Sequence, residues 1–168
     1  MRLIGRGLLM LAAVVGTSAL AIADDWFEFK STKYGFSYLV PVAPRESTEV
    51  GRTVVVHGFV VGDSTAFCNV LVSDYPTEID DALLAQTRDV YLARNAAHMT
   101  NSQRRTLSRG EEKLPAIEFD LENTAMFGRA IIAIDGTRVY QVSSGIPIDA
   151  EKAGLERCVR SFKLLPKK

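Results

Sequence analysis

The chain has 168 residues, 47% of them hydrophobic, with 20 basic and 20 acidic side chains. This length suits one ordinary domain with a sizeable core. The balanced charge does not provide the basic footprint that nucleic-acid-binding proteins and polybasic membrane-surface patches require.

The N-terminal residues have the layout of a secretory signal peptide. Two arginines precede an apolar run from Leu8 to Val15, and small residues follow as far as Ala23. This run is shorter than the roughly 20 residues that cross a bilayer. We therefore predict a cleaved signal peptide over residues 1–23 and a single α+β domain over residues 24–168. An uncleaved N-terminal anchor is the alternative.

Three segments in the first half of the chain are predicted to form strands. Residues 36–40 alternate between apolar and other side chains. Residues 53–61 are β-branched at most positions, which is typical of a strand buried on both faces. Residues 66–75 follow, and one face of this third strand carries Ala66, Cys68, Val70 and Val72. We therefore expect Cys68 to point into a core.

Residues 77–98 are predicted to form the first helix. They contain no glycine or proline, and Thr77 with the acidic residues that follow it suits a helix N-terminus. The expected apolar stripe consists of Ile79, Leu83, Val90 and Ala97, with Leu84 and Tyr91 on its flanks. A stripe of this width is enough to dock the helix on a sheet.

Residues 103–109 and 116–122 are predicted to pair as a β-hairpin. The second segment alternates strictly, so one face is expected to be buried (Ile117, Phe119 and Leu121) and the other wet (Glu118, Asp120 and Glu122). These acidic residues could collect a cation, but arginines of the neighbouring segment are expected to neutralise them instead: Arg104, Arg105 and Arg109.

A second hairpin is predicted around Asp135-Gly136, a dipeptide favoured in two-residue type I′ turns. This turn would place Ile132 opposite Val139 and Ile131 opposite Tyr140.

Residues 149–162 are predicted to form a second helix, with Asp149 as its N-cap. One face of this helix carries Leu155, Cys158, Val159 and Phe162. Because both cysteines point inward and exported proteins favour disulfides, we predict a bridge between Cys68 and Cys158. Closing a loop of about ninety residues corresponds to about 4–5 kcal/mol of chain entropy. Two separate buried thiols are the alternative.

The sequence has no pattern typical of a catalytic, metal or cofactor site. It lacks a C-x-x-C pair, a histidine spacing suited to metal, a G-x-S-x-G motif and a phosphate-binding glycine loop. His57 is expected to reach a polar partner at the rim of the sheet, and His98 to lie at a helix C-terminus. We therefore assign no catalytic residue, metal ligand or cofactor. An enzyme would need a deep pocket where His57 meets Asp74 or a serine.

Aromatic residues are concentrated near the predicted mature N-terminus: Trp26, Phe27, Phe29, Tyr34 and Phe36. We expect them to hold an N-terminal strand against the sheet. An exposed docking surface is the alternative.

Two short segments resemble exported PsbP-like domains: "YGFSYLVP" at residues 34–41 and "CVRSFKLL" at residues 158–165. They are similar to the first strand and the final helix-to-strand segment of that superfamily, over a stretch of nearly all of residues 26–165. The resemblance implies an antiparallel sheet of five to seven strands flanked by two main helices, and an adaptor or assembly role without shared catalytic residues. No family site is carried over, and the cysteine pair departs from the general pattern.

We therefore expect a small exported, non-enzymatic binding or assembly protein of the bacterial cell envelope, periplasmic or secreted. Its partner would be another envelope protein rather than nucleic acid, without stable membrane insertion after cleavage. The alternative is a periplasmic carrier of a small apolar ligand or lipid, because residues 53–61 and 125–134 have apolar positions on both faces. The oligomeric state is left open.

Overall fold

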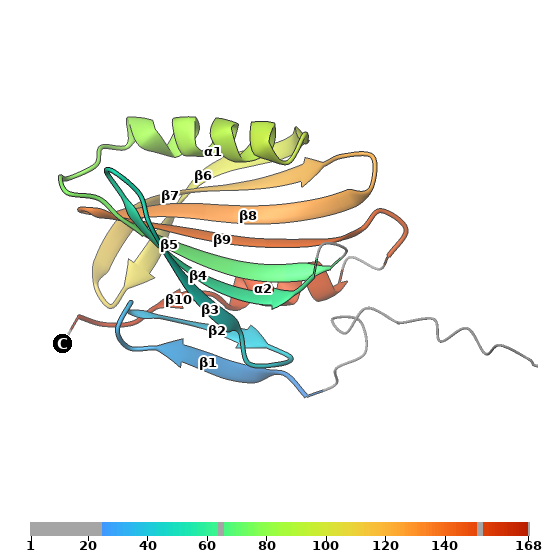
Figure 1. The fold of residues 1–168 in the computed structure, drawn as a ribbon, viewed down its shortest axis with the longest axis horizontal. Coiled ribbons are helices and arrows are strands. Elements are labelled where there is room, and N and C mark those ends of the chain that lie inside the picture. Colours follow the sequence, from blue (N-terminus) through green and yellow to red (C-terminus); the bar gives the residue numbers. More distant parts are fainter. Residues whose placement is uncertain (1–24, 64–65, 151–152, 168) are drawn as a thin grey trace, which may run out of the picture.

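The computed structural model describes residues 25–63, 66–150 and 153–167, except for the side chains of residues 153–156. The predicted signal peptide with its cleavage site lies outside the described residues, and so does the side chain of Leu155. Figure 1 shows the helices and strands. In chain order they are β1 (Phe27–Ser31), β2 (Phe36–Val40), β3 (Arg45–Val50), β4 (Val55–Gly62), β5 (Phe67–Asp74), α1 (Ala82–Arg94), β6 (His98–Arg109), β7 (Glu112–Glu122), β8 (Met126–Asp135), β9 (Arg138–Pro147), α2 (Ala153–Ser161) and β10 (Lys163–Leu164).

The strands form two sheets in which all neighbours are antiparallel. A three-stranded sheet has the order β1-β2-β10, and a seven-stranded sheet has the order β3-β4-β5-β9-β8-β7-β6. The predicted α+β fold, with a mostly antiparallel sheet and two main helices, is confirmed. The separate small sheet was not predicted.

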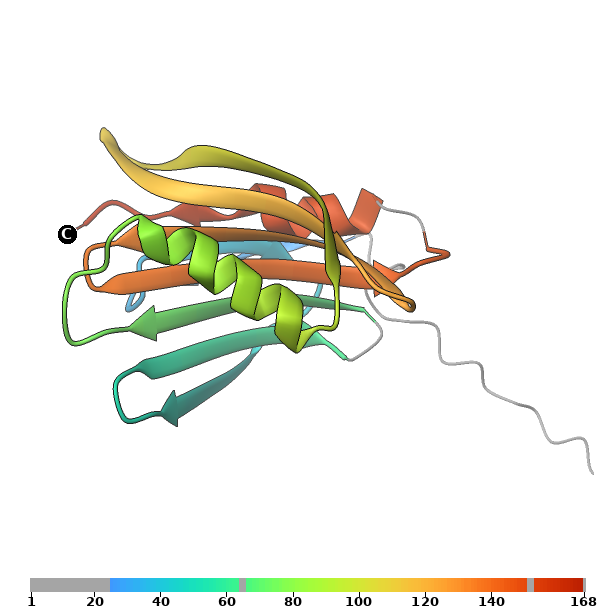
Figure 2. The same ribbon diagram turned by 90° about the horizontal axis from the view of Figure 1, so that it is seen from above.

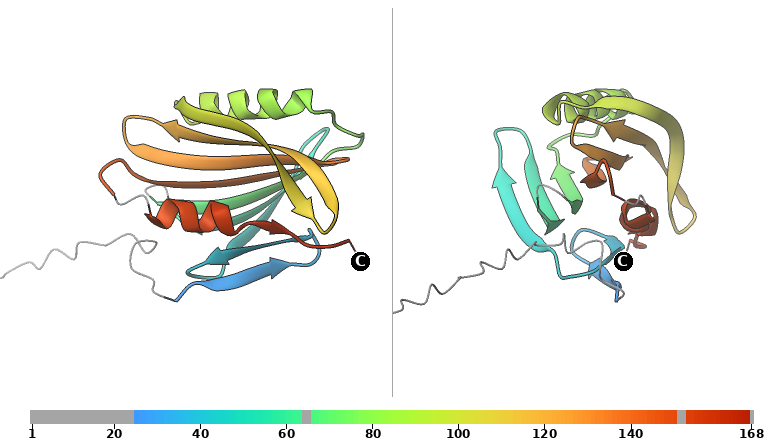
Figure 3. Two further views of the ribbon diagram at one scale, coloured as in Figure 1. Left: turned by 180° about the vertical axis from the view of Figure 1, so that it is seen from behind. Right: turned by 90° about the vertical axis from the view of Figure 1, so that its right-hand side faces the viewer.

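Each face of the large sheet is covered by a different layer. Figures 1 and 3 show α1 on one face and α2 with the small sheet on the other. Leu84 of α1 belongs to a hydrophobic cluster with Ile117, Phe119 and Ile132 of the sheet. Figure 2 shows that α1 runs diagonally over the sheet and that β3 and β4 lie beside it. Part of the large sheet is therefore left without a helix on the α1 side.

The larger cluster lies between the large sheet, α2 and the small sheet. It combines Phe36, Tyr38 and Val40 of β2 with Cys68, Val70 and Val72 of β5, and with Cys158 and Val159 of α2. Phe162 belongs to the same cluster, but it lies just after α2, which ends one residue earlier than predicted. The predicted inward faces of β2, β5 and the C-terminal helix are thus the faces that meet. The prediction that Asp149 is the N-cap of the second helix is wrong. Asp149 lies in a turn, and the described helix begins at Ala153.

Cys68 and Cys158 form a disulfide that joins β5 to α2. Their Cα atoms are 6.2 Å apart, and both residues are buried. Ser161 adds a second tie at the end of the same helix, because its Oγ accepts a hydrogen bond of 2.8 Å from the backbone N–H of Leu39 in β2. The last turn of α2 is thereby linked to both sheets.

The first helix is shorter than predicted. It begins at Ala82, with Asp81 rather than Thr77 at the N-cap, and ends at Arg94. Leu84 is 1% exposed and Tyr91 packs on Phe119, whereas Val90 is 45% exposed. The predicted stripe is therefore wrong at Val90, because that residue lies about 100° round the helix from Tyr91.

Residues just beyond the helix were also misassigned. His98 is not at a helix C-terminus; it is exposed and is the first residue of β6. Ala97 and Ile79 likewise lie outside the helix, although both pack against the cluster beneath α1.

Burial differs between the two faces of β4, contrary to the prediction from the sequence. Phe59 and Val61 are buried, whereas Val56 and Val60 on the opposite face are only half-buried. The prediction of a strand buried on both faces is wrong, because α1 does not extend over β4.

The hairpin formed by β8 and β9 is confirmed, but its predicted register is wrong by two residues. Asp135 pairs with Arg138, so the loop is Gly136-Thr137, and Ile132 faces Gln141. Gly136 has a φ of +60°. Glycine therefore occupies the first loop position, as type II′ turns prefer, instead of the second position of an Asp-Gly type I′ turn.

The hairpin formed by β6 and β7 is also confirmed, and both strands are longer than predicted. The face of β7 that was predicted to be exposed to solvent is partly buried, because Glu118 is only 8% exposed. Leu114 and Ala116 on the same face belong to the larger hydrophobic cluster. This face therefore starts in the core and turns toward solvent along β7.

Candidate functional site

A groove lies between α1 and the part of the large sheet that α1 leaves uncovered. Two adjoining cavities of about 360 and 540 Å³ share Leu71 and Gln141 of the sheet and Tyr91 of α1. We call it the α1 groove and define it by Val56, Val60, Leu71, Tyr91 and Gln141. Its floor consists of the half-buried faces of β4 and β5, and Leu83 and Val90 form the helix wall.

The rim of the α1 groove carries basic and amide side chains. Arg45 lines one cavity and donates a hydrogen bond of 3.1 Å to the carbonyl of Gly62. Arg94, in the last turn of α1, lines the other cavity, and no carboxylate among the described residues pairs with it. One carboxylate, Asp63, also lines the groove. The groove thus has a partly apolar floor, with two arginines and one carboxylate around it.

Asn69 and Tyr91 give the groove polar groups that can act on a ligand. Asn69 Oδ1 is a buried acceptor that receives no hydrogen bond among the described residues. Burial raises the pKa of Tyr91, although a hydrogen bond with Ser143 opposes that shift. The phenol therefore stays protonated at neutral pH. An N–H donor from a ligand would satisfy Asn69.

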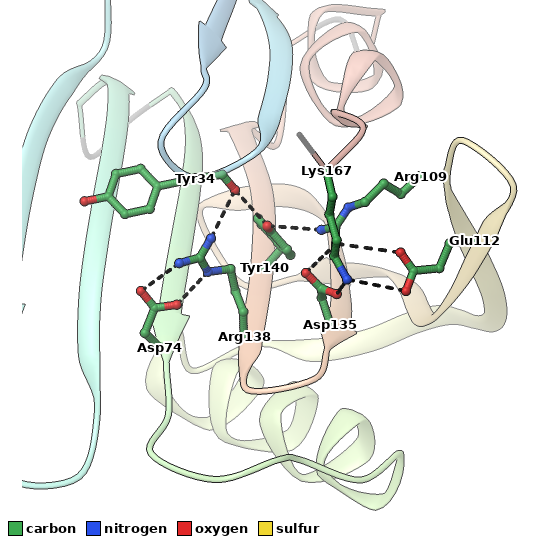
Figure 4. A network of polar contacts seen from close by, with 8 residues as sticks. All are labelled: Tyr34, Asp74, Arg109, Glu112, Asp135, Arg138, Tyr140 and Lys167. Atoms are coloured by element: carbon green, nitrogen blue, oxygen red, sulfur yellow. Dashed lines mark hydrogen bonds and ion pairs between the residues drawn. The ribbon is translucent and has the colours of Figure 1, made fainter.

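A second cleft, of about 450 Å³, lies where both sheets meet the C-terminal segment. Its walls come from the turn between β1 and β2, the hairpin end of β8 and β9, and the residues after β10. We call it the polar cleft and define it by Lys33, Tyr34, Arg109, Asp135, Arg138 and Lys167. Figure 4 shows the polar contacts that join most of these residues.

The polar cleft contains two arginines with separate carboxylate partners. Arg138 binds Asp74 with both arms, at 2.5 Å from Nε and 3.0 Å from Nη2, and this contact raises its pKa. Arg109 Nη1 lies 2.6 Å from Asp135 Oδ2. Both guanidinium groups are therefore held in fixed orientations by charged hydrogen bonds.

Tyr140 connects these two arginine sites. Its hydroxyl donates a hydrogen bond of 2.7 Å to the carbonyl of Tyr34 and accepts one of 3.3 Å from Arg109 Nη2. Burial raises the pKa of Tyr140, against the opposing effects of Arg138 and Arg109. The phenol is thus a neutral donor at the floor of the cleft.

His57 reaches polar partners at the edge of the sheet, as predicted. Its Nδ1 lies 3.0 Å from Thr48 Oγ1, and its Nε2 lies 3.7 Å from Asp74. The ring also packs on Tyr34, with centroids 4.5 Å apart. His57 and Asp74 do meet, but Asp74 is already bound by both arms of Arg138, and His57 lines neither the α1 groove nor the polar cleft.

Two of the three predicted acidic residues of β7, Glu118 and Asp120, are neutralised by arginines of two different strands, and no arginine is found to pair with Glu122 among the described residues. Arg105 of β6 pairs with Glu118, as predicted. Arg129 of β8 binds Asp120 at 2.6 and 3.1 Å, a partner that was not predicted. Arg104 and Arg109 do not serve this face, because the first lies 4.0 Å from Asp81 and the second pairs with Asp135. Among the described residues, no group of three or more metal-binding side chains is found.

The N-terminal aromatic residues contribute mainly to the core. Phe36 and Tyr34 are buried, and Trp26 and Phe29 pack against the larger cluster. Phe27 is the exception at 45% exposed. The expectation that these rings hold an N-terminal strand is therefore correct for four of the five positions. No helix within the described ranges is long and apolar enough to cross a bilayer.

The two sheets, their strand order and the two helices define a PsbP-like α+β fold. Over 94% of its length the chain is similar to the solution structure of cyanobacterial PsbP (CyanoP) from Synechocystis sp. PCC 6803, of which it covers 99%, with a TM-score of 0.54 and 14% sequence identity. No protein-family model and no curated protein sequence matches the chain. The predicted resemblance is thus confirmed for the fold, and the function has to be argued from the clefts.

Proposed function

We propose that the protein is an exported, non-enzymatic binding protein of the bacterial cell envelope, and that it holds a segment of another envelope protein in the α1 groove. The observation that carries this proposal is the half-buried apolar floor, Val56, Val60 and Leu71, which no element of the chain covers in the described residues. Apolar area left open to water favours a partner that buries it.

The chemistry of the groove favours a peptide segment over an apolar ligand. The buried acceptor Asn69 Oδ1 needs an N–H donor, which a peptide backbone supplies and a lipid tail does not. Two arginines, Arg45 and Arg94, line the groove against one carboxylate, Asp63, and this excess of positive charge complements a segment with acidic side chains. We therefore expect the bound segment to combine apolar and acidic residues.

Two features support export. The N-terminal residues have the composition of a signal peptide. A disulfide such as that between Cys68 and Cys158 is typical of proteins in oxidising compartments. The periplasm, or the medium outside the cell, is therefore the place where we expect the partner.

Photo-crosslinking from the helix wall tests this function. A photoreactive residue at Val90, which lines the groove, should crosslink to one envelope protein in cells. The same residue at Val50 should not, because Val50 is 79% exposed but does not line the groove. Mass spectrometry of the crosslink should locate an apolar and acidic segment of the partner.

A matched pair of charge substitutions provides the control. Val90→Glu should weaken partner binding at least about tenfold, because it places a carboxylate in the apolar helix wall of the groove. Val50→Glu should leave binding unchanged. Equal crosslinking from both positions, or equal effects of both substitutions, would contradict binding in the α1 groove.

The second candidate is a carrier of a small apolar ligand or lipid. Its support is the larger cavity of the groove, which has about 540 Å³ and an apolar wall of Val54, Leu83 and Val90. Native mass spectrometry of freshly purified protein separates the two functions. A copurified apolar molecule that is lost in the Val90→Glu variant would favour the carrier.

A further inference from the structure

The polar cleft has a different composition from the α1 groove and shares no lining residue with it. Four cationic side chains line the polar cleft: Lys33, Arg109, Arg138 and Lys167. Three carboxylates pair with members of this set: Asp74, Glu112 and Asp135. The cluster therefore retains one more positive than negative charge.

Lys33 is the cation of this set that is not held in an ion pair among the described residues. Its Nζ lies 4.9 Å from the centre of the Tyr34 ring. A hydrogen bond with Tyr34 and the more distant charges of Glu46 and Asp74 raise its pKa, so it remains an ammonium group. Lys167 is also only loosely paired, at 3.3 Å from Asp135 and 3.6 Å from Glu112, and its side chain is 64% exposed. Both ammonium groups can turn toward a ligand in the cleft.

Arg109 supplies an unsatisfied donor to the same cleft. The residue is 6% exposed, and its Nε–H has no acceptor among the described residues, although both Nη atoms are bonded. A buried donor without an acceptor costs about 1–3 kcal/mol. An acceptor oxygen that enters the cleft would remove this cost.

The remaining donors suit a tetrahedral oxyanion better than a carboxylate. Arg138 already makes a bidentate pair with Asp74 through Nε and Nη2. A carboxylate ligand therefore could not form a bidentate pair with this guanidinium group. The donors that are left for a ligand are the ammonium groups of Lys33 and Lys167 and the single Nε–H of Arg109. Ammonium groups bind phosphate as point charges from several directions.

We propose that the polar cleft binds a phosphate group, either free or carried on a small molecule or a lipid headgroup. Lys33 and Lys167 provide the charge, and Arg109 Nε provides the buried donor. The volume of about 450 Å³ accommodates a phosphate together with a small organic substituent. Leu165 and Pro166 line the same cleft and would contact that substituent.

An NMR titration of the protein with inorganic phosphate tests the proposal. Backbone amide shifts should be saturable, with a dissociation constant on the order of 1 mM or below, and should centre on Gly35 and Leu165 at the cleft walls. Parallel titrations with glycerol phosphate and with vesicles containing phosphatidic acid distinguish the sources of the phosphate. Tighter binding of one of them identifies that source.

Two charge variants make the test specific. Lys33→Ala combined with Lys167→Ala should weaken phosphate binding at least about tenfold, because two charged donors are lost. Lys30→Ala, which removes a 55% exposed lysine outside the cleft, should leave binding unchanged. The proposal is overturned if none of the three probes causes saturable shifts at the cleft. It is also overturned if chloride at equal ionic strength causes the same shifts, or if Lys30→Ala weakens binding as much as the double variant.

Discussion

The hydroxyl of Tyr140 donates a hydrogen bond of 2.7 Å to the backbone carbonyl of Tyr34, which is 106 residues earlier in the chain. This contact joins β9 of the large sheet to the turn that precedes β2 of the small sheet. The same hydroxyl accepts from Arg109 Nη2, so its removal affects both a buried carbonyl and a buried guanidinium.

Tyr140→Phe should therefore destabilise the protein. Loss of the hydroxyl leaves Arg109 with a second unsatisfied N–H and weakens the link between the sheets. We expect the free energy of unfolding to fall by about 1–2 kcal/mol. Urea unfolding followed by circular dichroism measures this change. An unaltered midpoint would mean that the hydrogen bond contributes no net stability.

Tyr38→Phe should change the free energy of unfolding in the opposite direction, and it serves as the matched control. Tyr38 is 0% exposed, and its hydroxyl has no hydrogen-bond partner among the described residues. Removal of an unsatisfied buried hydroxyl should raise the free energy of unfolding by about 1 kcal/mol. The same urea titration applies, and a loss of stability would indicate a partner for this hydroxyl.

Stability should decline at alkaline pH because of buried tyrosines. Burial is the largest cause of the raised pKa values of Tyr38, Tyr91 and Tyr140, whose ordinary value is 10.0. Above that value the unfolded chain loses phenolic protons that the folded protein retains. The unfolded state then binds fewer protons, and stability falls as pH rises.

Urea midpoints at about pH 8 and about pH 11 measure this dependence. The Tyr38→Phe variant should lose less stability between these two values than the wild-type protein, because one buried phenol has been removed. Equal losses in the two proteins would exclude Tyr38 as a source of the alkaline effect.

The disulfide should contribute a large part of the total stability. Replacement of both Cys68 and Cys158 by alanine opens a loop with a sequence separation of 90 residues. The chain-entropy estimate for such a loop is about 4–5 kcal/mol. Urea unfolding of the double variant and of the reduced wild-type protein should show similar losses. Two alkylatable thiols in the unreduced, purified protein would contradict the bridge.

Two glycines with positive φ should differ in their tolerance of alanine. Gly62 has a φ of +91°, and an added Cβ would overlap the carbonyl oxygen of Ala66. Gly136 has a φ of +60° and no neighbouring atom within 4 Å of the added Cβ. Gly136→Ala should cost about 1–2 kcal/mol from backbone strain alone. Gly62→Ala should cost several kcal/mol more, as measured by thermal unfolding, and equal costs would show that Ala66 moves away freely.

Short-range patterns predicted the parts of the fold that depend on burial. Alternation in β2 and β5 identified the faces of Tyr38 and Cys68 that enter the core, and helical spacing placed Cys158 and Val159 on the buried face of α2. These features are local, because a strand or helix with one apolar face has only one way to bury it.

Features that depend on pairing were not predicted. All residues of β3 are exposed and mostly polar, so β3 is recognisable only through its pairing with β4. The register of the hairpin formed by β8 and β9 depends on whether glycine takes the first or second loop position, and the dipeptide Asp135-Gly136 is compatible with both. The burial of Glu118 depends on its arginine partners, which come from two different strands.

The sequence contained a signal for one of the two clefts and none for the other. The apolar pattern on both faces of residues 53–61 did contain a signal for the α1 groove, because Val56 and Val60 form part of its floor. The polar cleft had no comparable signal. Lys33, Arg138 and Lys167 come from three distant segments, and only the finished topology brings them together.

The disulfide between β5 and α2 also has a consequence that depends on its redox state. When the two sulfurs are reduced, the last helix is held only by side-chain packing and by hydrogen bonds such as that of Ser161. Under reducing conditions the C-terminal segment should therefore separate from the large sheet more easily than the other elements do. Because residues 165–167 form one wall of the polar cleft, the redox state of a single cysteine pair would then govern how firmly that wall is fixed.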